Sequence, residues 1–476
     1  MLAPRTPPHH TSSLNNVTDS LNRRDLLKQA LALGAGIAAA GVLTPAPAIA
    51  ESVSAPRVSG QAPERASEAA TMRAVPFDRH ETVRIAIVGT GLRGRSILSE
   101  LLAIDHVRIV ALCDIVPEKA AGAMKMCTDA GMPAPDVYTR DERDFERVAA
   151  RDDVDFVYTA TPWEWHVPVM LAALGAGKHC GTECPAGITL KDLWALVDAS
   201  EKSQRHCLQL ENCNYGYNEM LVNRLVHDGV FGEIQHGSAA YIHDLRTILF
   251  ENRDEGLWRR AWHTKVNGNL YPTHGLGPVA WYMDVHAGDR LDHLVSMSTA
   301  ERGLTRHREA TVPDRADPKW SERYVTGDLN SSLIKTAKGR TILLQHDVSS
   351  PRPYSRLNGI AGTKGVFEDY PPRIYVEGQE GGHGFGGIDM WKASHEPPLW
   401  TRVGELARKK GGHGGMDFVM AWRLIECMRE GLAPDFDVYD AAAWSAPLPL
   451  SQMSVAQGSA PMQFPDFTRG EWMKAR

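Results

Sequence analysis

Residues 83–94 read Val83-Arg-Ile-Ala-Ile-Val-Gly-Thr-Gly-Leu-Arg-Gly94, and they decide the fold of the first half of the chain. The apolar, β-branched run before Gly89 is typical of a buried parallel strand. The glycines follow with the spacing of the dinucleotide fingerprint, in which Gly89 permits a tight turn, Gly91 admits a pyrophosphate and Gly94 allows close helix packing. The stretch therefore predicts a strand, a phosphate-binding turn and the start of a helix.

A second strand-like run, Arg108–Cys113, ends at Asp114, about 20 residues after the glycines. An acid at this position accepts hydrogen bonds from the adenosine ribose and repels a 2′-phosphate, which favours NAD. Arg93 and Arg95 would soften that preference, so NADP stays open as an alternative; both arginines could also belong to a solvated loop. We predict NAD as the cofactor.

Strands and helices continue to alternate as far as residue 215. We expect strands at Val154–Thr159, His179–Thr182 and His206–Leu210, and helices at His166–Ala176 and Leu190–Lys202. This alternation is typical of a doubly wound parallel sheet of the α/β class. We therefore predict a Rossmann NAD-binding domain over residues 81–215, with its ligands at the carboxyl ends of the strands.

The second half of the chain reads as consecutive strands joined by short turns such as Lys338-Gly339. We expect strands at Ile234–Ile242, Leu294–Thr299, Leu329–Thr336, Thr341–Val348 and Leu357–Phe367. They predict a C-terminal α+β domain over residues 216–476, with an open, mainly antiparallel sheet that serves substrate binding and oligomerisation. An exposed sheet face makes a homo-oligomer, most simply a dimer, the expected assembly.

The first 50 residues have the features of a twin-arginine signal peptide. Arg23-Arg24 precedes a mildly apolar run, Leu31–Leu43, and the segment ends at an A-x-A-like site, Ala48-Ile49-Ala50. An amphipathic or membrane-anchoring N-terminus is the alternative, although the run is short for a bilayer span. We predict folded export by the twin-arginine machinery to the periplasm or the medium, without stable membrane insertion after cleavage. Residues 51–80, rich in Ser, Pro, Ala and Arg, are predicted to be a linker.

Charge and cysteine usage exclude several classes of protein. The formal net charge of −6 is spread along the chain, and no basic block suggests a nucleic-acid partner. The 7 cysteines have irregular spacing, which argues against a disulfide framework. Cys180 and Cys184 lack the His or Cys complement of a known metal motif, so no metal is predicted. A nucleophilic role for Cys184 is disfavoured, because nothing nearby in the sequence lowers the pKa of its thiol.

The order of the two domains resembles the Gfo/Idh/MocA-type oxidoreductases. In those enzymes the strand that corresponds to residues 179–185 usually ends in Glu-Lys-Pro, and its lysine assists proton transfer at the hydroxyl that is oxidised. This chain has Glu183-Cys184-Pro185 instead, so the lysine is missing.

Longer motifs resemble glycoside hydrolase family 109, a family of NAD-dependent α-N-acetylgalactosaminidases that also lacks the lysine. The resemblance spans roughly residues 82–470. Its motifs are Thr161-Pro-Trp-Glu-Trp-His-Val-Pro168, Glu211-Asn-Cys-Asn-Tyr215, Ala240-Tyr-Ile-His-Asp-Leu-Arg246, Gly268-Asn-Leu-Tyr-Pro-Thr-His-Gly-Leu-Gly-Pro278 and Gln345-His-Asp-Val-Ser-Ser-Pro-Arg-Pro-Tyr-Ser-Arg356. The run His413-Gly-Gly-Met-Asp417 is also similar to the family, but we assign it no role.

The resemblance implies glycoside cleavage without the two flanking carboxylates of an ordinary glycosidase. Hydride passes from sugar C3 to bound NAD, and the resulting ketone acidifies the C2 proton. A base removes this proton, the C1 substituent leaves by elimination, water adds back, and the hydride returns. No cofactor is consumed, which suits a protein exported with NAD already bound.

The same resemblance implies which residues bind the cofactor. Leu92 and Arg93 would lie over the pyrophosphate, and Asp114 would hold the ribose. The remaining cofactor contacts are expected from a wall at the end of the next strand and from two later strand ends: Trp163, Glu164, Trp165, His166, Glu183, Cys184 and Asn212. For the wall, a helix N-terminus with core tryptophans is the alternative interpretation.

For the sugar, the resemblance implies a second set of residues: Tyr241, Arg259, Tyr271, Pro272, Thr273, His274 and Tyr354. Tyr271 and His274 are the expected catalytic pair, because imidazole and phenol can both exchange protons with a developing alkoxide or enolate. Which of the two serves C2 stays open. Arg259 would donate to the sugar or its acetamido group, with a surface salt bridge as the alternative.

Two other functions remain possible at this point. One is an exported NAD(P)-dependent sugar oxidoreductase with net redox turnover. The other is a non-catalytic binding module, which would not need the complete nucleotide fingerprint.

Overall fold

The structure is a computed structural model that describes residues 64–66, 69–379 and 384–474. The predicted signal peptide, residues 1–50, and residues 51–63 of the predicted linker lie outside the described residues.

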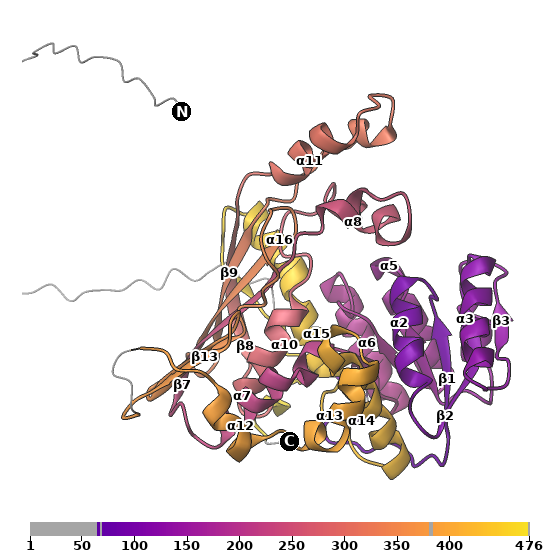
Figure 1. Cartoon of the computed structure of the whole chain (residues 1–476), viewed down its shortest axis with the longest axis horizontal. Helices are drawn as coiled ribbons and strands as arrows, with labels where there is room; N and C mark the ends of the chain where they lie inside the picture. The colour runs from indigo at the N-terminus through magenta and orange to yellow at the C-terminus, as the bar shows by residue number, and fades with distance from the viewer. Residues whose placement is uncertain (1–63, 67–68, 380–383, 475–476) are drawn as a thin grey trace, which may run out of the picture. The chain divides into compact units, whose positions relative to one another are not determined.

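The first half of the chain forms a parallel six-stranded sheet (Figure 1). The strand order is β3-β2-β1-β4-β5-β6, which is the order of a doubly wound dinucleotide-binding fold and confirms the predicted class. Its strands are β1 (Val83–Val88), β2 (Val107–Cys113), β3 (Asp136–Tyr138), β4 (Phe156–Thr159), β5 (His179–Thr182) and β6 (Cys207–Gln209).

The helices between these strands include both predicted helices, although α5 begins at Trp163, before the predicted start at His166. They are α2 (Leu92–Leu101), α3 (Pro117–Asp129), α4 (Phe145–Ala149), α5 (Trp163–Gly175) and α6 (Leu190–Ser203). Helix α5 ends before Gly177, whose φ of 73° provides the left-handed residue expected at a helix C-terminus. Helix α6 begins at Thr189, whose hydroxyl accepts a hydrogen bond from the Asp192 N–H.

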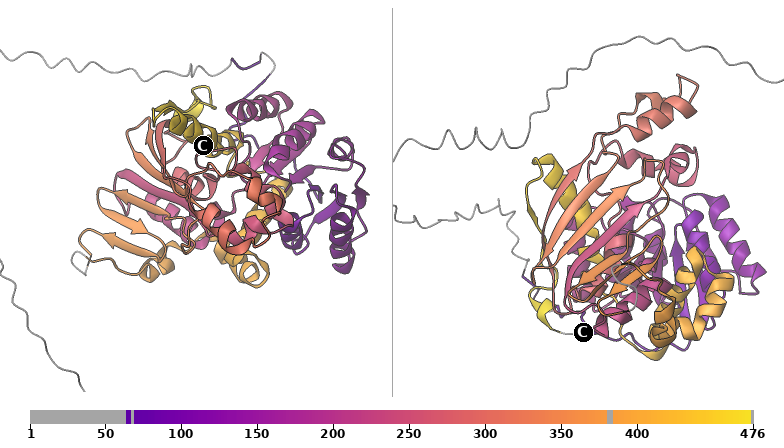
Figure 2. Two further views of the ribbon diagram at one scale, coloured as in Figure 1. Left: turned by 90° about the horizontal axis from the view of Figure 1, so that it is seen from above. Right: turned by 60° about the vertical axis from the view of Figure 1, so that its left-hand side comes forward.

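The second sheet has eight strands in the order β13-β12-β11-β7-β10-β9-β8-β14. Figure 2 shows it as a layer separate from the first sheet. It is mainly antiparallel, as predicted, except that β7 and β10 pair in parallel. Its strands are β7 (Ile234–Ile242), β8 (Leu291–Ser298), β9 (Asn330–Thr336), β10 (Thr341–Asp347), β11 (Gly359–Gly362), β12 (Gly365–Glu368), β13 (Arg373–Val376) and β14 (Met462–Gln463).

One predicted strand of this sheet is wrong. The sequence predicts a single strand over Leu357–Phe367, but the structure has a hairpin of β11 and β12 with Thr363 and Lys364 at its turn. The flanking Gly362 and Gly365 let the ends of the hairpin pack closely on neighbouring segments, because a Cβ would lie 2.3 Å from the Phe231 carbonyl oxygen at Gly362 and 2.6 Å from the Tyr375 carbonyl oxygen at Gly365.

Helices α7 (Tyr217–His227) and α10 (Thr273–Tyr282) lie between the two sheets, next to the 3-10 turn η1 (Asn212–Tyr215). Two glycines bring α10 close to both neighbours. A Cβ at Gly275 would lie 2.3 Å from the Ala240 nitrogen in β7, and a Cβ at Gly277 would lie 2.5 Å from Asn214 Oδ1 in η1. The start of α10 is therefore held against both halves of the molecule.

The C-terminal part of the chain returns to the first sheet. Helix α14 packs on α2, and α15 packs on α6 and β6, whereas α16 packs on β8 of the second sheet. The helices of this part are α12 (Asp389–His395), α13 (Pro398–Lys410), α14 (Met416–Glu430), α15 (Val438–Ser445) and α16 (Pro447–Ala456), with the 3-10 turns η4 (His413–Gly415) and η5 (Glu471–Met473). Residues after position 216 therefore contribute to the surroundings of the Rossmann sheet as well.

The predicted linker ends earlier than its composition suggests. Met72 and Phe77 are almost fully buried, and the Phe77 ring packs on His179 and His206 at centroid distances of 4.8 and 4.3 Å. Burial of two large apolar side chains outweighs the linker-like composition around them. Residues 69–80 are therefore part of the folded domain, which corrects that portion of the predicted linker.

A short helical segment, α8 (Arg246–Phe250), η2 (Asp254–Leu257) and α9 (Arg259–Trp262), crosses from the second sheet towards the first. Helix α11 (Gly303–Thr311) packs near α8, and the 3-10 turn η3 (Pro318–Ser321) follows it. Within the described ranges, no helix has both the length and the apolar character that a membrane crossing requires.

Candidate active site

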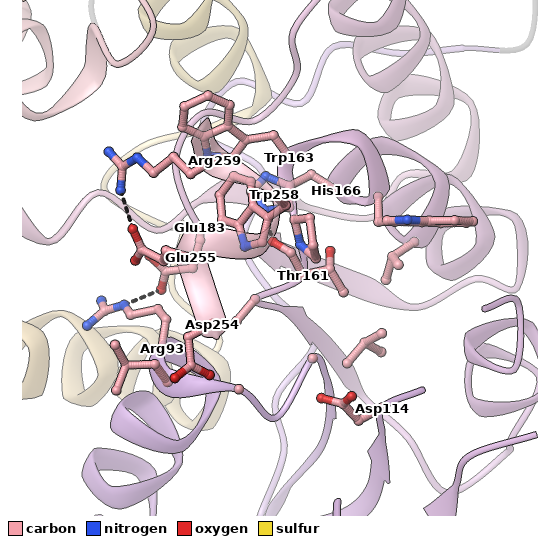
Figure 3. Close-up of a pocket in the computed structure, with 18 of the residues that line it drawn as sticks. Arg93, Asp114, Thr161, Trp163, His166, Glu183, Asp254, Glu255, Trp258 and Arg259 are labelled. Atoms are coloured by element: carbon pink, nitrogen blue, oxygen red, sulfur yellow. Dashed lines mark hydrogen bonds and ion pairs between the residues drawn. The ribbon is translucent and has the colours of Figure 1, made fainter. Parts of the chain in front are cut away.

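A cavity of about 480 Å³ opens at the carboxyl ends of β1, β4 and β5. Its walls come from the glycine-rich turn, the start of α5, the segment η2–α9 and the start of α10. Figure 3 shows Asp114 at one end and Arg259, Trp163 and Trp258 towards the other. Position and volume are those of a ligand site in a doubly wound fold.

The glycine-rich turn has the geometry that the fingerprint requires. Gly89 has a φ of +86°, and a Cβ at Gly94 would lie 1.9 Å from the Gly89 carbonyl oxygen. Gly91 precedes α2 without a side-chain cap, and the nearest described atom to a Cβ there is Lys119 Nζ at 3.8 Å. The first-turn N–H groups of α2 are thus left for an anion such as a pyrophosphate.

Asp114 lies at the end of β2, where two backbone N–H groups orient its carboxylate. Thr90 donates at 2.7 Å and Val116 at 2.9 Å. A carboxylate has further lone pairs, so ribose hydroxyls can still bind to it. The side chains of Leu92 and Ile115 line the same cavity although they are 58% and 64% exposed. Such unfilled apolar surface fits an adenine base.

Arg93 lines the cavity, but its guanidinium is paired with protein carboxylates. Its Nε lies 2.9 Å from Glu183 Oε1, and its Nη1 lies 2.7 Å from Asp417 Oδ2. Asn212 Nδ2 donates to the other oxygen of Asp417 at 2.5 Å. Arg93 therefore binds Glu183 and Asp417, and Asp417 in turn binds Asn212, so the guanidinium is engaged by protein carboxylates.

Asp417 is a site residue that the sequence did not reveal. It is fully buried in α14 and also accepts a hydrogen bond from His413 at 2.8 Å, and His413 itself lines the cavity. Burial acts to raise the pKa of Asp417, but the His413 hydrogen bond and the charge of Arg93 outweigh it and lower the pKa well below its usual range. The only signal in the sequence is the family-like run around it.

The two tryptophans of the predicted wall line the cavity, but Glu164 does not. Trp163 is buried, packs against Trp258 at a centroid distance of 5.3 Å and is the first residue of α5. The motif is therefore both a wall of the cavity and a helix N-terminus with a buried tryptophan. Glu164 is exposed and faces a surface depression beside Pro168 on the outer side of α5. This differs from the expectation that all four residues of the motif face the cofactor.

His166 connects the ends of two strands. Its Nδ1 lies 2.8 Å from the Pro185 carbonyl oxygen and its Nε2 lies 2.9 Å from the Thr161 carbonyl oxygen. Burial lowers the pKa of His166, so the ring is neutral and donates to one of these carbonyls at a time. His166 thereby stabilises the cavity wall between β4 and β5.

An aromatic group with a single cation forms the end of the cavity opposite Asp114. Ring centroids of Tyr241 and Tyr271 lie 4.6 Å apart, and those of Tyr271 and His274 lie 4.8 Å apart. The Arg259 guanidinium lies 5.1 Å from the Tyr271 centroid and 5.4 Å from that of Trp163, and it pairs with Glu255 at 2.7 Å. Arg259 is only 7% exposed whereas the Glu255 side chain is 29% exposed, so the arginine is buried in the cavity wall and its partner is half-buried.

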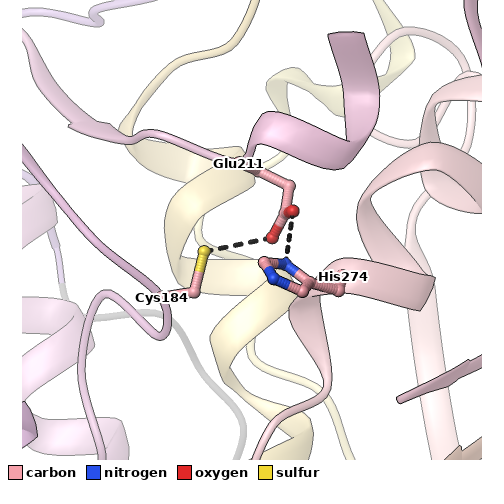
Figure 4. A group of neighbouring side chains, drawn as sticks. All are labelled: Cys184, Glu211 and His274. Carbon is pink, nitrogen blue, oxygen red and sulfur yellow. Dashed lines mark hydrogen bonds and ion pairs between the residues drawn. The ribbon is translucent and has the colours of Figure 1, made fainter. Parts of the chain in front are cut away.

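Cys184, Glu211 and His274 form a compact group beside the tyrosines (Figure 4). Glu211 Oε1 lies 2.6 Å from His274 Nδ1, and Glu211 Oε2 lies 3.1 Å from Cys184 Sγ. Burial acts to raise the pKa of Glu211, but the charge and hydrogen bond of His274 lower it to about 2. Burial raises the pKa of the Cys184 thiol well above its usual value, which agrees with the expectation of an unreactive cysteine.

Three residues assigned to the substrate by resemblance lie behind the cavity wall. Pro272 and Thr273 are buried at the start of α10 and do not line the cavity. Tyr354 packs its ring 6.3 Å from that of Tyr241, and its hydroxyl accepts a hydrogen bond from Arg356. In the structure these three residues support the residues that face the cavity.

The other residues assigned from sequence divide between lining and packing. Gly94 packs α2 against the turn and does not line the cavity. Those that line it are Gly89, Gly91, Leu92, Arg93, Asp114, Trp163, Trp165, His166, Glu183, Cys184, Asn212, Tyr241, Arg259, Tyr271 and His274.

An ion pair joins the two halves across the mouth of the cavity. Lys119 Nζ on α3 lies 3.3 Å from Asp254 Oδ1 on η2. Asp254, Glu255 and Leu257 of η2 line the same cavity as Gly91. The segment around η2 therefore covers the part of the site where the glycine turn would hold a dinucleotide.

Comparisons with known proteins agree with both halves of this architecture. Residues 215–474 match the family model described as Glycosyl hydrolase 109, C-terminal domain, and residues 83–210 match the model described as Oxidoreductase family, NAD-binding Rossmann fold. A Glycosyl hydrolase family 109 protein of Saccharopolyspora erythraea is 52% identical over 456 residues, which cover 96% of each chain. Another from Solibacter usitatus is 51% identical and covers 95% of this chain and 98% of its own. The chain belongs to glycosyl hydrolase family 109.

Solved dehydrogenase structures share the fold of this family 109 protein. A scyllo-inositol dehydrogenase of Lactobacillus casei with bound NAD(H) and scyllo-inositol matches with a TM-score of 0.57 at 16% identity, over 80% of this chain and 99% of its own. A levoglucosan dehydrogenase in complex with NADH and levoglucosan matches with a TM-score of 0.61 at 17% identity, over 81% and 100%. The family 109 protein thus has an NAD-binding Rossmann domain. The uncapped α2 terminus, the open space at Gly91 and the placement of Asp114 all fit NAD.

Two glycine substitutions separate the packing role of the turn from its binding role. Gly94→Ala forces a Cβ against the Gly89 carbonyl, so we expect the free energy of unfolding to fall by more than about 2 kcal/mol. Gly91→Ala meets open space, so we expect the melting temperature of the cofactor-free family 109 protein to change by less than about 2 °C. It should nevertheless weaken NAD binding at least about tenfold, because the Cβ enters the space that the pyrophosphate approaches. Calorimetric melting and titration with NAD measure both effects, and equal destabilisation by the two variants would contradict this division.

Breaking the Lys119–Asp254 pair should speed release of the cofactor. Because the pair is partly exposed, Lys119→Ala or Asp254→Asn is expected to raise the NADH release rate about two- to fivefold. Stopped-flow NADH fluorescence measures the rate. Lys125→Ala is the matched control, since Lys125 pairs with Asp129 on the same helix α3 but away from the cavity. A charge exchange of Lys119 and Asp254 should restore slow release; if release is unchanged in both single variants, the pair does not retain the cofactor.

Proposed function

We propose that this family 109 protein cleaves α-N-acetylgalactosaminides or related glycosides by temporary oxidation of the sugar at C3. The observation that carries the proposal is the position of Tyr271 and His274, which line one cavity together with the glycine turn and Asp114. A proton-transferring pair and a nicotinamide site in one cavity are what an oxidation and elimination sequence requires.

When bound, NAD supplies a hydride acceptor for sugar C3 and returns the hydride at the end of the cycle. The C3 ketone acidifies the proton at C2, so that a base of ordinary strength can remove it. The substituent at C1 then leaves by elimination, and water adds back across the double bond. The residues of the chain have to move protons at C2 and at the C3 hydroxyl.

Tyr271 and His274 are suited to different parts of this proton transfer. Burial raises the pKa of Tyr271 well above its usual value, so its hydroxyl stays protonated and acts as a hydrogen-bond donor. Within the described residues its hydroxyl has no hydrogen-bond partner, and it is therefore available to the sugar. His274 keeps one nitrogen on Glu211 and presents the other to the cavity.

The carboxylates near the tyrosines do not form the pair of an ordinary glycosidase. Glu211 is fully buried behind His274, and Glu255 is paired with the Arg259 guanidinium. A general acid and a nucleophile would both need free access to the glycosidic bond. This arrangement favours elimination chemistry over direct displacement.

Arg259 is the proposed donor to the ring substituents of the sugar. Its guanidinium lies among Trp163, Tyr241 and Tyr271, which exclude water and strengthen a hydrogen bond to an acetamido oxygen or a hydroxyl. We propose the acetamido group as its partner, because an amide oxygen is a strong acceptor for a guanidinium.

We further propose that the protein is exported by the twin-arginine machinery to the periplasm or the medium. Arg23-Arg24, the apolar run after them and Ala48-Ile49-Ala50 support this proposal. A homo-oligomer is proposed as well, because Met297 on β8 and Leu333 on β9 leave large apolar side chains 65% and 48% exposed.

The enzyme should release nitrophenol from p-nitrophenyl α-N-acetylgalactosaminide without accumulation of NADH. Tyr271→Phe and His274→Ala should each lower kcat about 10²–10⁴-fold, while the bound NAD stays in place. Tyr375→Phe on β13 and His293→Ala on β8 are controls outside the cavity and should leave kcat unchanged.

Net NADH formation in step with sugar consumption would instead identify a sugar oxidoreductase. Loss of NAD from both site variants would show that Tyr271 and His274 are structural. The absence of any turnover with a range of glycosides and free sugars would favour a binding module.

A further inference from the structure

We propose that Glu211 is a positioning residue that makes Nε2 of His274 the proton acceptor at sugar C2. We also propose that Cys184, because its thiol is uncharged, does not compete with His274 for the negative charge of Glu211. The inference rests on the proposed elimination chemistry and assigns the base that the sequence leaves open between Tyr271 and His274.

Glu211 is held in one orientation by contacts to both of its oxygens. Oε1 accepts from the Cys213 N–H at 3.2 Å and faces His274 Nδ1 at 2.6 Å, and Oε2 faces Cys184 Sγ at 3.1 Å. The side chain is fully buried. A Cβ at Gly277 would lie 3.0 Å from Glu211 Cγ, so α10 packs directly against this glutamate. The carboxylate therefore cannot turn away from the histidine.

Among the residues that the structure describes, Glu211 is the anion that contacts His274. The titratable groups around it are Cys184 at the end of β5, Tyr241 and His243 on and after β7, and Tyr271 before α10. Burial raises the pKa of Cys184, Tyr241 and Tyr271 and lowers that of His243, so all four are uncharged near neutral pH. The nearby cation, Arg259, is neutralised by Glu255. Glu211 is thus the charge that acts on His274.

This contact decides which nitrogen of His274 reacts. A carboxylate without a proton can only accept, so Nδ1 carries the hydrogen and donates it to Glu211. The lone pair is then on Nε2. This atom has no hydrogen-bond partner within the described residues, and the ring lines the cavity.

The proton step balances within these groups. The C2–H bond of the C3 ketone breaks, its proton moves to Nε2, and its electrons form the C1–C2 double bond as the C1 substituent leaves. The imidazolium that results is stabilised by Glu211, which itself keeps its negative charge. The departed C1 substituent takes a proton from the water that adds its hydroxyl group to C1. The proton on Nε2 exchanges with solvent in the meantime, so Nε2 delivers a solvent-derived proton to C2. During the oxidation, the proton of the C3 hydroxyl passes through the Tyr271 hydroxyl to water in the cavity, and it returns by the same route when the hydride comes back. Tyr271 is therefore protonated before and after each step, and it donates a hydrogen bond to the oxygen at C3.

Cys184 lies at a place from which a cation could compete with His274 for Glu211. Its Sγ contacts the oxygen that does not face His274. A neutral thiol is a weak donor and leaves the carboxylate charge almost intact. An ammonium group here would form an ion pair with Glu211 and reduce the stabilisation of the imidazolium.

The first test replaces the charge of Glu211 and keeps its shape. Glu211→Gln should lower kcat about 10²–10⁴-fold with little change in KM, because the imidazolium that forms at His274 loses the anion that stabilises it. Glu211→Asp keeps the charge and should recover part of kcat. Retention of NAD, measured by absorbance, shows that each variant is folded.

A second readout does not depend on turnover. Nitrogen NMR of 15N-histidine-labelled holoenzyme, with the His274 signal assigned by its loss in His274→Gln, should show hydrogen on Nδ1 in the wild type. Glu211→Gln should change the tautomer ratio of that signal. A wild-type His274 with hydrogen on Nε2, or a signal and kcat that are both unchanged in Glu211→Gln, would overturn the role of Glu211.

The third test introduces the competing charge. Cys184→Lys and Cys184→Met add side chains of similar length, and only the lysine carries charge. We expect Cys184→Lys to lose at least about tenfold more kcat than Cys184→Met at equal NAD content. Equal losses would overturn the role of the neutral thiol.

If the wild type cleaves no glycoside, the proposed function fails, whereas the NMR result still decides whether Glu211 fixes the tautomer of His274.

Discussion

The contact between the Glu211 carboxylate and His274 is the constraint on which the active site depends. It connects the end of β6 in the NAD-binding domain with the start of α10 in the second half of the chain. It can form only because Gly275 and Gly277 let α10 approach β7 and η1 closely. The same approach brings Tyr271 and His274 into the cavity of the glycine turn, so the two proposed proton-transferring groups and the cofactor site are positioned by one packing arrangement.

Paired charges explain why so few groups of this cavity are available for chemistry. Arg93 is paired with Glu183 and Asp417, Arg259 with Glu255, and Lys119 with Asp254. Buried charges are stable when they are paired and hydrogen-bonded, and breaking one partner is costly. The pairs therefore keep the wall rigid and leave the Tyr271 hydroxyl and His274 Nε2 as groups that can meet a sugar. In the proposed cycle NAD is regenerated at each turnover, so firm retention of the cofactor would be an advantage.

Local signals in the sequence were sufficient for five of the six strands of the first sheet, but they did not predict its short edge strand β3 (Asp136–Tyr138). The glycine spacing, Asp114 and the alternation of strands and helices depend on short-range geometry, and the structure has the predicted doubly wound parallel sheet. Glu211 and Asp417 could not be assigned, because their partners are 63 and 324 residues away in the chain and are chosen by tertiary packing. The burial of Met72 and Phe77 and the hairpin within 357–367 likewise depend on what packs around them. Glu164 differs from its neighbours Trp163 and Trp165 because it points to the outer side of α5.

The central claim is that oxidation at C3 makes the proton at C2 acidic enough to be removed during glycoside cleavage. The most direct measurement is turnover of an α-N-acetylgalactosaminide in deuterium oxide, followed by NMR of the released sugar. The account predicts deuterium at C2 of the product, with the C3 hydrogen retained from the substrate. Efficient cleavage that leaves the original hydrogen at C2 would contradict it.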